Sequence, residues 1–243
     1  FTKTGDSKLT LSGANTYRGN TFVENGVLQI GNGGESGSLE DVSDIRIQNV
    51  ASLWFNRSDD FSSKSVISGS GSIRKLGDGV LSLEAPSPGF EGQIYVDDGA
   101  LDLKGSVLGR ELEDYRDGVT PKLSIAAGAE VLASDGKNYV QILKGDGDLK
   151  LEKSASFVIQ SSAISSIFDG KISGEGDLIL SGSDADLTLT SENALEGKVV
   201  VKQSQRKVTP KQIILSDSGT LGSADLLLEG ENTELVFDRD NSF

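Results

Sequence analysis

The sequence predicts an all-β chain folded as a parallel β-helix, or solenoid, with loop insertions. One phrase of short strands and glycines occurs three times along the chain. Its strands alternate apolar and polar residues, which gives each strand one face to bury. Gly, Asn, Asp and Ser, which tolerate the backbone of tight turns, separate the strands. Self-similarity of this kind is the signature of units that are stable only when stacked.

The repeated phrase is most complete at residues 9–31, which read LTLSGANTYRGNTFVENGVLQIG. A second copy at 81–105 reads LSLEAPSPGFEGQIYVDDGALDLKG, and its alignment with the first places Tyr17 on Phe90. A third copy near 195–201 keeps only a framework of leucine, glycine and valine. Each unit is too short and too polar to bury a core alone, so stacking of successive units is expected.

The repeats extend into three modules, at about 3–60, 67–135 and 172–237, which together form one β-helix segment. The stretch at about 136–171 is predicted to be a less regular bridge. Rungs of about 20–25 residues give about ten turns. At about 4.8 Å per stacked strand, the rod would be about 50 Å long.

The pattern places individual elements along the phrase. Strands are expected at 9–11, 27–30, 81–83 and 101–103, where apolar and polar residues alternate. The side chains expected inside the stack include Leu11, Val23, Leu28, Val96, Leu101 and Val201. Glycines that recur at one position of the phrase are expected at corners with positive φ or no room for a side chain, at Gly19, Gly26, Gly92, Gly99 and Gly197. Residues 109–117 fit either a short helix or an excursion loop.

Many short, evenly spaced strands joined by glycine-containing turns also fit a β-sandwich or an antiparallel barrel. Three features favour the solenoid. The chain of 243 residues is longer than an ordinary sandwich domain. The repeats run end to end, and the strands follow one another closely without long crossovers.

Composition limits the classes of partner. The net charge is −14 and the isoelectric point is about 4.4. Nucleic acids and anionic membranes attract Lys and Arg, so this acidity argues against both, and it keeps a long stack soluble. No stretch approaches the roughly 20 apolar residues of a membrane helix. A chain with 36% hydrophobic residues can bury a substantial core without disulfides.

Residues 9–31 closely resemble the autotransporter-associated β-strand repeat, a phrase of the form LTLSGxNTYTGxTxVxxGxLxxG. Residues 67–83 resemble the glycine-rich phrase that precedes it. The second copy of the repeat lacks the NTY core. The resemblance implies a passenger domain of a Gram-negative type V secreted protein. Such passengers are right-handed parallel β-helices, exported to the cell surface or the medium through a C-terminal outer-membrane barrel of the same precursor.

Catalysis has few residues to draw on. The chain contains no histidine and no cysteine, which removes His-based triads, thiol catalysis and ordinary zinc sites. No enzyme activity, cofactor or metal is therefore expected. Carboxylates remain, and the pair Asp59–Asp60 interrupts the repeat beside Arg57. Neighbouring strand residues point to opposite faces, however, which does not suit an acid–base pair. The pair Asp97–Asp98 precedes a repeat glycine and is expected to be turn framework.

Partner binding is expected at departures from the repeat, because loops on a rigid scaffold carry function. Three segments depart from it: 57–64, 109–122 and 202–211. The second is a charged insertion, and the third is a basic strip in an acidic chain. The candidate partner-binding residues are Arg110, Tyr115 and Arg116 in the insertion, and Lys202, Arg206, Lys207 and Lys211 in the strip.

Three classes of function remain consistent with the sequence. The first is an adhesin or virulence factor that binds a host-cell surface protein or glycan, or another copy of itself. The second is a carboxylate-based, glycan-active enzyme on the same fold. The third is a structural spacer that carries a distal functional domain. A cleft with two carboxyl groups about 5–10 Å apart would favour the enzyme.

Overall fold

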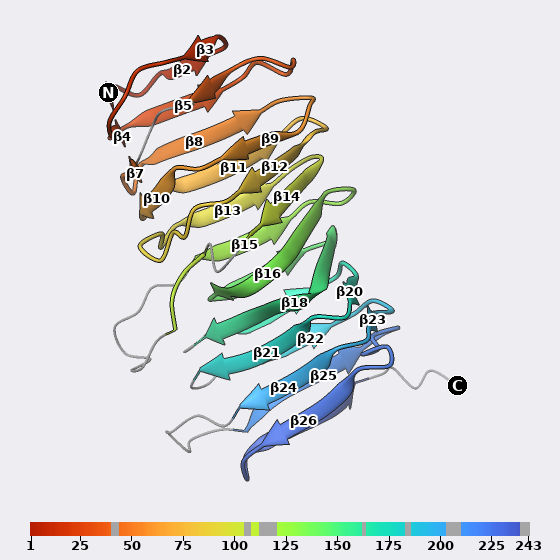
Figure 1. Cartoon of the computed structure of the whole chain (residues 1–243). Coiled ribbons are helices and arrows are strands. Elements are labelled where there is room, and N and C mark those ends of the chain that lie inside the picture. The colour runs from red at the N-terminus through yellow and green to blue at the C-terminus, as the bar shows by residue number, and fades with distance from the viewer. Residues whose placement is uncertain are drawn as a thin grey trace.

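The protein is a stack of parallel strands (Figure 1). The computed structural model describes residues 1–39, 44–104, 108–111, 121–161, 164–182, 186–202 and 210–238, and these contain strands and turns but no helix. The first strands lie at one end of the stack and β26 lies at the other. Every strand pairing among the described residues is parallel and joins one rung to the next. This confirms the β-helix and excludes the sandwich and the antiparallel barrel.

The strands form three sides of the stack. The long sheet has eleven strands: β2 (Lys8–Leu11), β5 (Gly26–Ile30), β8 (Ala51–Asn56), β11 (Ser72–Leu76), β13 (Gln93–Val96), β15 (Lys122–Ile125), β17 (Ile142–Gly145), β19 (Ser166–Phe168), β22 (Leu187–Leu189), β25 (Lys211–Ser216) and β27 (Thr233–Asp238).

The second sheet has ten strands: β9 (Phe61–Ser63), β12 (Val80–Leu83), β14 (Ala100–Leu103), β16 (Glu130–Val140), β18 (Asp148–Ser161), β20 (Ile172–Gly174), β21 (Asp177–Gly182), β23 (Ala194–Leu195), β24 (Lys198–Lys202) and β26 (Asp225–Glu229). A four-stranded sheet contains β1 (Thr2–Lys3), β4 (Thr21–Val23), β7 (Asp44–Ile47) and β10 (Val66–Gly69). A two-stranded sheet contains β3 (Ala14–Asn15) and β6 (Ser38–Leu39).

The third side changes its composition along the stack. In the first rungs it is the four-stranded sheet. Further on, β16 and β18 are long enough to turn the corner, with a register shift between Ala133 and Asp135. The first part of β18 pairs with β20 through Leu149, and its second part pairs with β21 through Phe157. The second halves of β16 and β18, with β21, β24 and β26, therefore form the third side of the later rungs.

The core is one continuous column of inward side chains. Leu28, Leu53, Ile73 and Ile94 stack in register on successive strands of the long sheet, and each is fully buried. Of the side chains expected inside, Val23, Leu28, Val96, Leu101 and Val201 are fully buried, and Leu11 is partly buried against the core. Because each rung covers the apolar face of its neighbour, the stack supplies the burial that no single unit can.

The repeated phrase does not keep to one side of the solenoid. Val23 lies on the third side, whereas its counterpart Val96 lies in the long sheet. Leu28 lies in the long sheet, whereas its counterpart Leu101 lies in the second sheet. All four point inward. The phrase therefore encodes a strand, a corner and a strand, and two different corners of the stack accept it.

The stretch expected to be an irregular bridge is regular in its backbone. The described part of residues 136–171 holds the end of β16 and all of β17, β18 and β19, and β18 is the longest strand described. Repeat identity is weak there because long strands replace the short glycine-bounded ones. Of residues 109–117, those from 112 onward lie outside the described part of the chain, so the choice between helix and loop stays a prediction.

The recurrent glycines lie at corners, as expected. Gly19, Gly26 and Gly99 have positive φ, and Gly92 and Gly197 lie against the backbone of the rung before. At Gly26, φ is 66° and an added Cβ would lie 2.6 Å from the carbonyl oxygen of Gly5. At Gly92, an added Cβ would overlap the carbonyl oxygen of Gly71. Four of these corners are thus too tight for a side chain, whereas Gly19 has open space and is distinguished by its positive φ alone.

Candidate partner-binding surfaces

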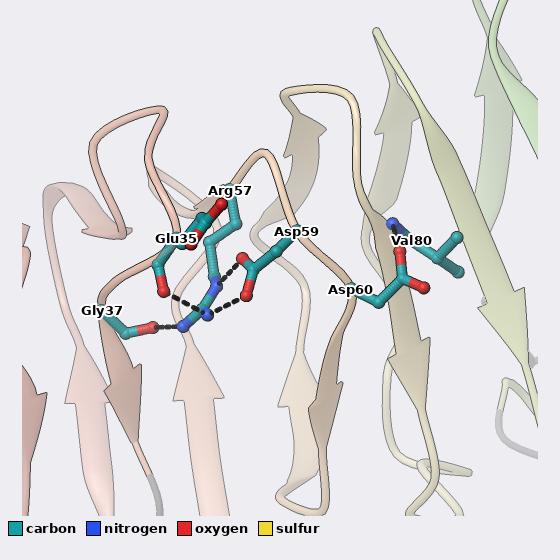
Figure 2. Close-up of polar contacts among 6 residues, drawn as sticks. All are labelled: Glu35, Gly37, Arg57, Asp59, Asp60 and Val80. Atoms are coloured by element: carbon teal, nitrogen blue, oxygen red, sulfur yellow. Dashed lines mark hydrogen bonds and ion pairs between the residues drawn. The ribbon is translucent and has the colours of Figure 1, made fainter.

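Arg57 joins two neighbouring rungs (Figure 2). It follows the end of β8, and its side chain is only 13% exposed. Its guanidinium donates hydrogen bonds to the carbonyl oxygens of Gly37 at 2.6 Å and Glu35 at 2.7 Å. It also donates to both oxygens of Asp59, at 2.8 and 2.7 Å, and lies 4.8 Å from the ring of Phe61. A planar, five-donor guanidinium suits this role, since it satisfies several acceptors at once.

The two carboxylates beside Arg57 have structural partners. The hydrogen bond from Arg57 lowers the pKa of the Asp59 carboxyl below its ordinary value of 3.8. Asp60 turns toward the next rung, where its Oδ1 accepts a hydrogen bond of 2.9 Å from the backbone N–H of Val80. A general acid needs a carboxyl with a raised pKa facing its partner. The pKa of Asp59 is shifted in the opposite direction, and Asp60 turns toward a different rung, so the two residues organise turns.

The second carboxylate pair is turn framework, as expected. Asp98 accepts a hydrogen bond of 2.9 Å from the N–H of Gly99, and Asp97 forms an ion pair of 3.0 Å with Arg74. Among the described residues, no three Asp, Glu, His or Cys side chains group together as they would around a metal ion. Nor does any helix in that part of the chain have the length and apolarity that crossing a bilayer requires.

The basic strip is only partly on the surface. Lys202 ends β24 and is exposed. Arg206 and Lys207 lie outside the described residues. Lys211 begins β25 and is 1% exposed, because the alternation of this strand turns its first side chain inward. Lys211 therefore does not belong to an exposed contact surface, which corrects the extent of the strip.

The charged insertion begins on the same side as the strip. Arg110 is exposed, and Tyr115 and Arg116 lie outside the described residues. Glu111 and Lys202 line one small hollow of about 50 Å³ on the third side. Tyr139 lies between them and donates a hydrogen bond of 3.5 Å to Glu111. The structure thus brings together two segments that the sequence presents as separate.

The sequence pattern did not single out an aromatic and cationic ladder on the outer face of the long sheet. Trp54, Arg74 and Tyr95 occupy the same outward position on β8, β11 and β13. The guanidinium carbon of Arg74 lies 5.7 Å from the ring centroid of Trp54 and 5.0 Å from that of Tyr95. The signal was present in the alternation of these strands, because each of the three stands between two buried residues, which are apolar on both sides of Trp54 and Tyr95 and are Ile73 and Lys75 beside Arg74.

A groove adjoins the end of this ladder. It has a volume of about 370 Å³ and crosses β13, β15 and β17. Its outward lining side chains are Gln93, Tyr95, Lys122, Ser124 and Lys144, with Ile142 and Ile164 at one side. Ser124 pairs with Tyr95 on one strand and with Lys144 on the other. The groove exists because a small serine separates two long side chains.

Comparison with known proteins agrees with this architecture. The family model of the passenger-associated transport repeat matches residues 1–30. A segment of 69 residues, 28% of this chain, is 45% identical to the adhesin BmaC autotransporter of Brucella suis biovar 1 (strain 1330). That match spans 2% of the length of the relative. No solved structure matches the chain significantly.

The transport repeat spans β1 to β5, which are the strands of the first rung and two strands of the second, where the repeated phrase is most complete. The same phrase returns in later rungs, and all described strands belong to one parallel stack. In its repeat, in its similarity to an autotransporter over 69 residues and in its β-solenoid fold, this chain resembles the passenger domains of autotransporters.

Proposed function

We propose that this chain is a non-catalytic, adhesive part of an autotransporter passenger. It is exported to the bacterial surface or released, and it binds a host-cell surface protein or glycan, or another copy of itself. The similarity to a protein named an adhesin supports this assignment. Because the chain matches only a small part of that relative, the binding activity of the whole protein is part of the proposal.

The observation that carries the proposal is the ladder of Trp54, Arg74 and Tyr95 on the outer face of the long sheet. Trp, Tyr and Arg are the residue types that dominate the binding energy of protein interfaces. Trp54 is the single tryptophan of the chain, and it lies on this outer face rather than in the core. A rigid stack presents these side chains in a fixed order, so little conformational entropy is lost when a partner binds.

A carboxylate-based enzyme has less support. The two carboxylate pairs that the sequence offers are engaged in turns, with Arg57, Val80, Gly99 and Arg74 as their partners. A glycosidase needs one carboxyl group that protonates the leaving oxygen and another that acts across the scissile bond. Neither pair leaves a carboxyl group free for the first role.

Adhesion tests the proposal directly. Beads coated with the purified chain should adhere to cultured epithelial cells more than beads coated with albumin. The double variant Trp54→Ser/Tyr95→Ser should lower adhesion several-fold. Phe22→Ser removes an exposed aromatic ring from the third side and should leave adhesion unchanged. Adhesion equal to that of albumin beads would refute the host-cell part of the proposal.

Self-association is tested separately, because it would rest on the basic strip. Lys202→Glu/Arg206→Glu/Lys207→Glu should remove any dimer seen by sedimentation velocity at low salt, since an acidic rod needs a basic counterpart. Lys150→Glu/Lys153→Glu/Lys171→Glu makes the same change of charge on exposed lysines elsewhere. A chain that is monomeric at low salt, or one that loses its dimer equally in both variants, excludes the strip as a contact.

A further inference from the structure

The groove between Tyr95 and Lys144 has features that the adhesive ladder alone does not explain. We propose that it binds an acidic saccharide, with a sugar ring seated over Ser124 and its carboxylate held by Lys122 and Lys144. This assignment rests on the proposed adhesive function and names the ligand class of one part of that surface.

The shape of the groove fits a thin, flat ligand. Its volume of about 370 Å³ lies near the lower end of the range for small-ligand sites, about 300–1,000 Å³. Tyr95, Ser124 and Lys144 are direct neighbours on three successive strands. Parallel strands lie about 4.8 Å apart, so the short side chain of Ser124 leaves about one strand's width on either side. One sugar ring fills such a space.

The charge of the groove selects an anion. Lys122 and Lys144 line it, and none of its lining residues is Asp or Glu. Within the described part of the chain, neither lysine forms an ion pair with a carboxylate. The chain has a net charge of −14, whereas the charged residues that line this groove are two lysines. The groove is therefore locally positive on an acidic protein. Charge-assisted hydrogen bonds from both ammonium groups suit a carboxylate ligand.

The remaining lining residues distinguish a saccharide from a simple anion. Tyr95 offers an aromatic face and Ile164 an exposed apolar side chain, which suit the C–H face of a sugar ring. Gln93 and Ser124 offer donors and acceptors for its hydroxyl groups. An inorganic anion needs no aromatic face, and an aliphatic carboxylate has no hydroxyl groups for Gln93 and Ser124.

The aromatic face is held in place before a ligand arrives. Arg74 lies 5.0 Å from the Tyr95 ring on the side away from Ser124, and Asp97 holds Arg74 at 3.0 Å. The hydroxyl of Tyr95 donates a hydrogen bond to Gln93 within the same strand. Because Arg74 contacts the face of the Tyr95 ring and Gln93 accepts a hydrogen bond from its hydroxyl, the side chain loses little conformational entropy when a ligand binds. This favours affinity for a small ligand.

Calorimetric titration of the full chain tests the assignment. The probes are 3′-sialyllactose and a hyaluronan tetrasaccharide, which carry sugar carboxylates, and lactose, which is neutral. We expect at least one acidic probe to bind at about 1 mM or tighter, and to bind more weakly when NaCl rises from about 20 to about 300 mM. Lactose should bind at least about tenfold more weakly.

Two variants separate charge from shape. Lys122→Gln/Lys144→Gln removes both ammonium groups and should weaken acidic-probe binding at least about tenfold. Lys171→Gln/Lys198→Gln makes the same change of net charge on exposed lysines outside the groove and should leave binding unchanged. Ser124→Tyr fills the groove at a partly exposed, outward strand position without changing charge, and it should abolish binding while the melting temperature is kept.

Several outcomes would overturn the inference. These are no heat of binding with either acidic probe, equal binding of lactose, equal binding of a tetraglutamate peptide, or full binding by Ser124→Tyr. Failure here with intact adhesion of coated beads overturns the groove assignment alone. Absence of bead adhesion with intact binding of an acidic saccharide overturns the host-cell proposal and leaves the groove assignment standing.

Discussion

Arg57 and Asp59 are two residues apart, and their side chains form a bidentate pair with N–O distances of 2.8 and 2.7 Å. The same guanidinium binds the carbonyl oxygens of Glu35 and Gly37 in the preceding loop. The pair therefore fastens one rung to the next at a corner where the repeat is interrupted. An arginine that looks like a binding residue in the sequence is a structural clamp.

Loss of this clamp should destabilise the stack. Arg57→Ala removes hydrogen bonds to two carbonyl oxygens and a carboxylate, and also the contact with Phe61. We expect the free energy of unfolding to fall by about 2 kcal/mol, in the range for hydrogen bonds to charged groups. Urea denaturation measures the change. Lys171→Ala, at an exposed site, is the control, and equal stability of both variants would contradict the role of Arg57.

The stabilising effect of Asp59 should depend on pH. Its folded-state pKa is lowered below 3.8 by the hydrogen bond from Arg57. The contribution is therefore present above that ordinary value and is lost as pH falls through the folded pKa. Asp59→Asn should melt below the wild type near pH 6, and the difference should shrink toward about pH 2. A difference in melting temperature that is constant across this range would contradict the pair.

The core should not tolerate a charge. Leu28 is fully buried between Leu9 and Leu53 on neighbouring strands. Leu28→Asp places a carboxylate in a dry stack without a partner, so we expect unfolding free energy to drop by about 4 kcal/mol or more. Val50→Asp, at a side chain 71% exposed, should change it by less than about 0.5 kcal/mol. Equal chemical denaturation curves for the two variants would mean that the rungs are not stacked as described.

Two glycines with positive φ allow strain to be separated from steric overlap. Gly19 has open space around it, whereas Gly26 faces the backbone of Gly5 at 2.6 Å from an added Cβ. Gly19→Ala should cost about 1–2 kcal/mol for the left-handed backbone alone. Gly26→Ala should cost clearly more, because backbone atoms must also move. Thermal unfolding of the two variants side by side measures the difference. A smaller loss of stability for Gly26→Ala than for Gly19→Ala would contradict the close backbone contact at Gly26.

The pattern of the chain determined the local structure. Alternation fixed which side chains of a strand turn inward, so Val23, Leu28, Val96 and Leu101 are all buried as predicted. The recurrent glycines fixed the corners, because these positions require either a positive φ, as at Gly19, or the absence of a side chain where rungs touch, as at Gly92. Parallel stacking followed from the repeat, since no unit could bury its apolar face alone. These properties depend on residues close together in the sequence.

The tertiary structure decided which side of the solenoid each strand occupies and which outward side chains become neighbours, because both depend on the rotation of one rung relative to the next. Copies of one phrase lie on different sides of the solenoid, because the rungs differ in length and two different corners accept the same strand–corner–strand unit. That rotation aligned Trp54, Arg74 and Tyr95, and it brought Lys144 within two strands of Tyr95. It also turned Lys211 inward. Surfaces of this kind arise between rungs about 20 residues apart, at separations that local alternation does not specify.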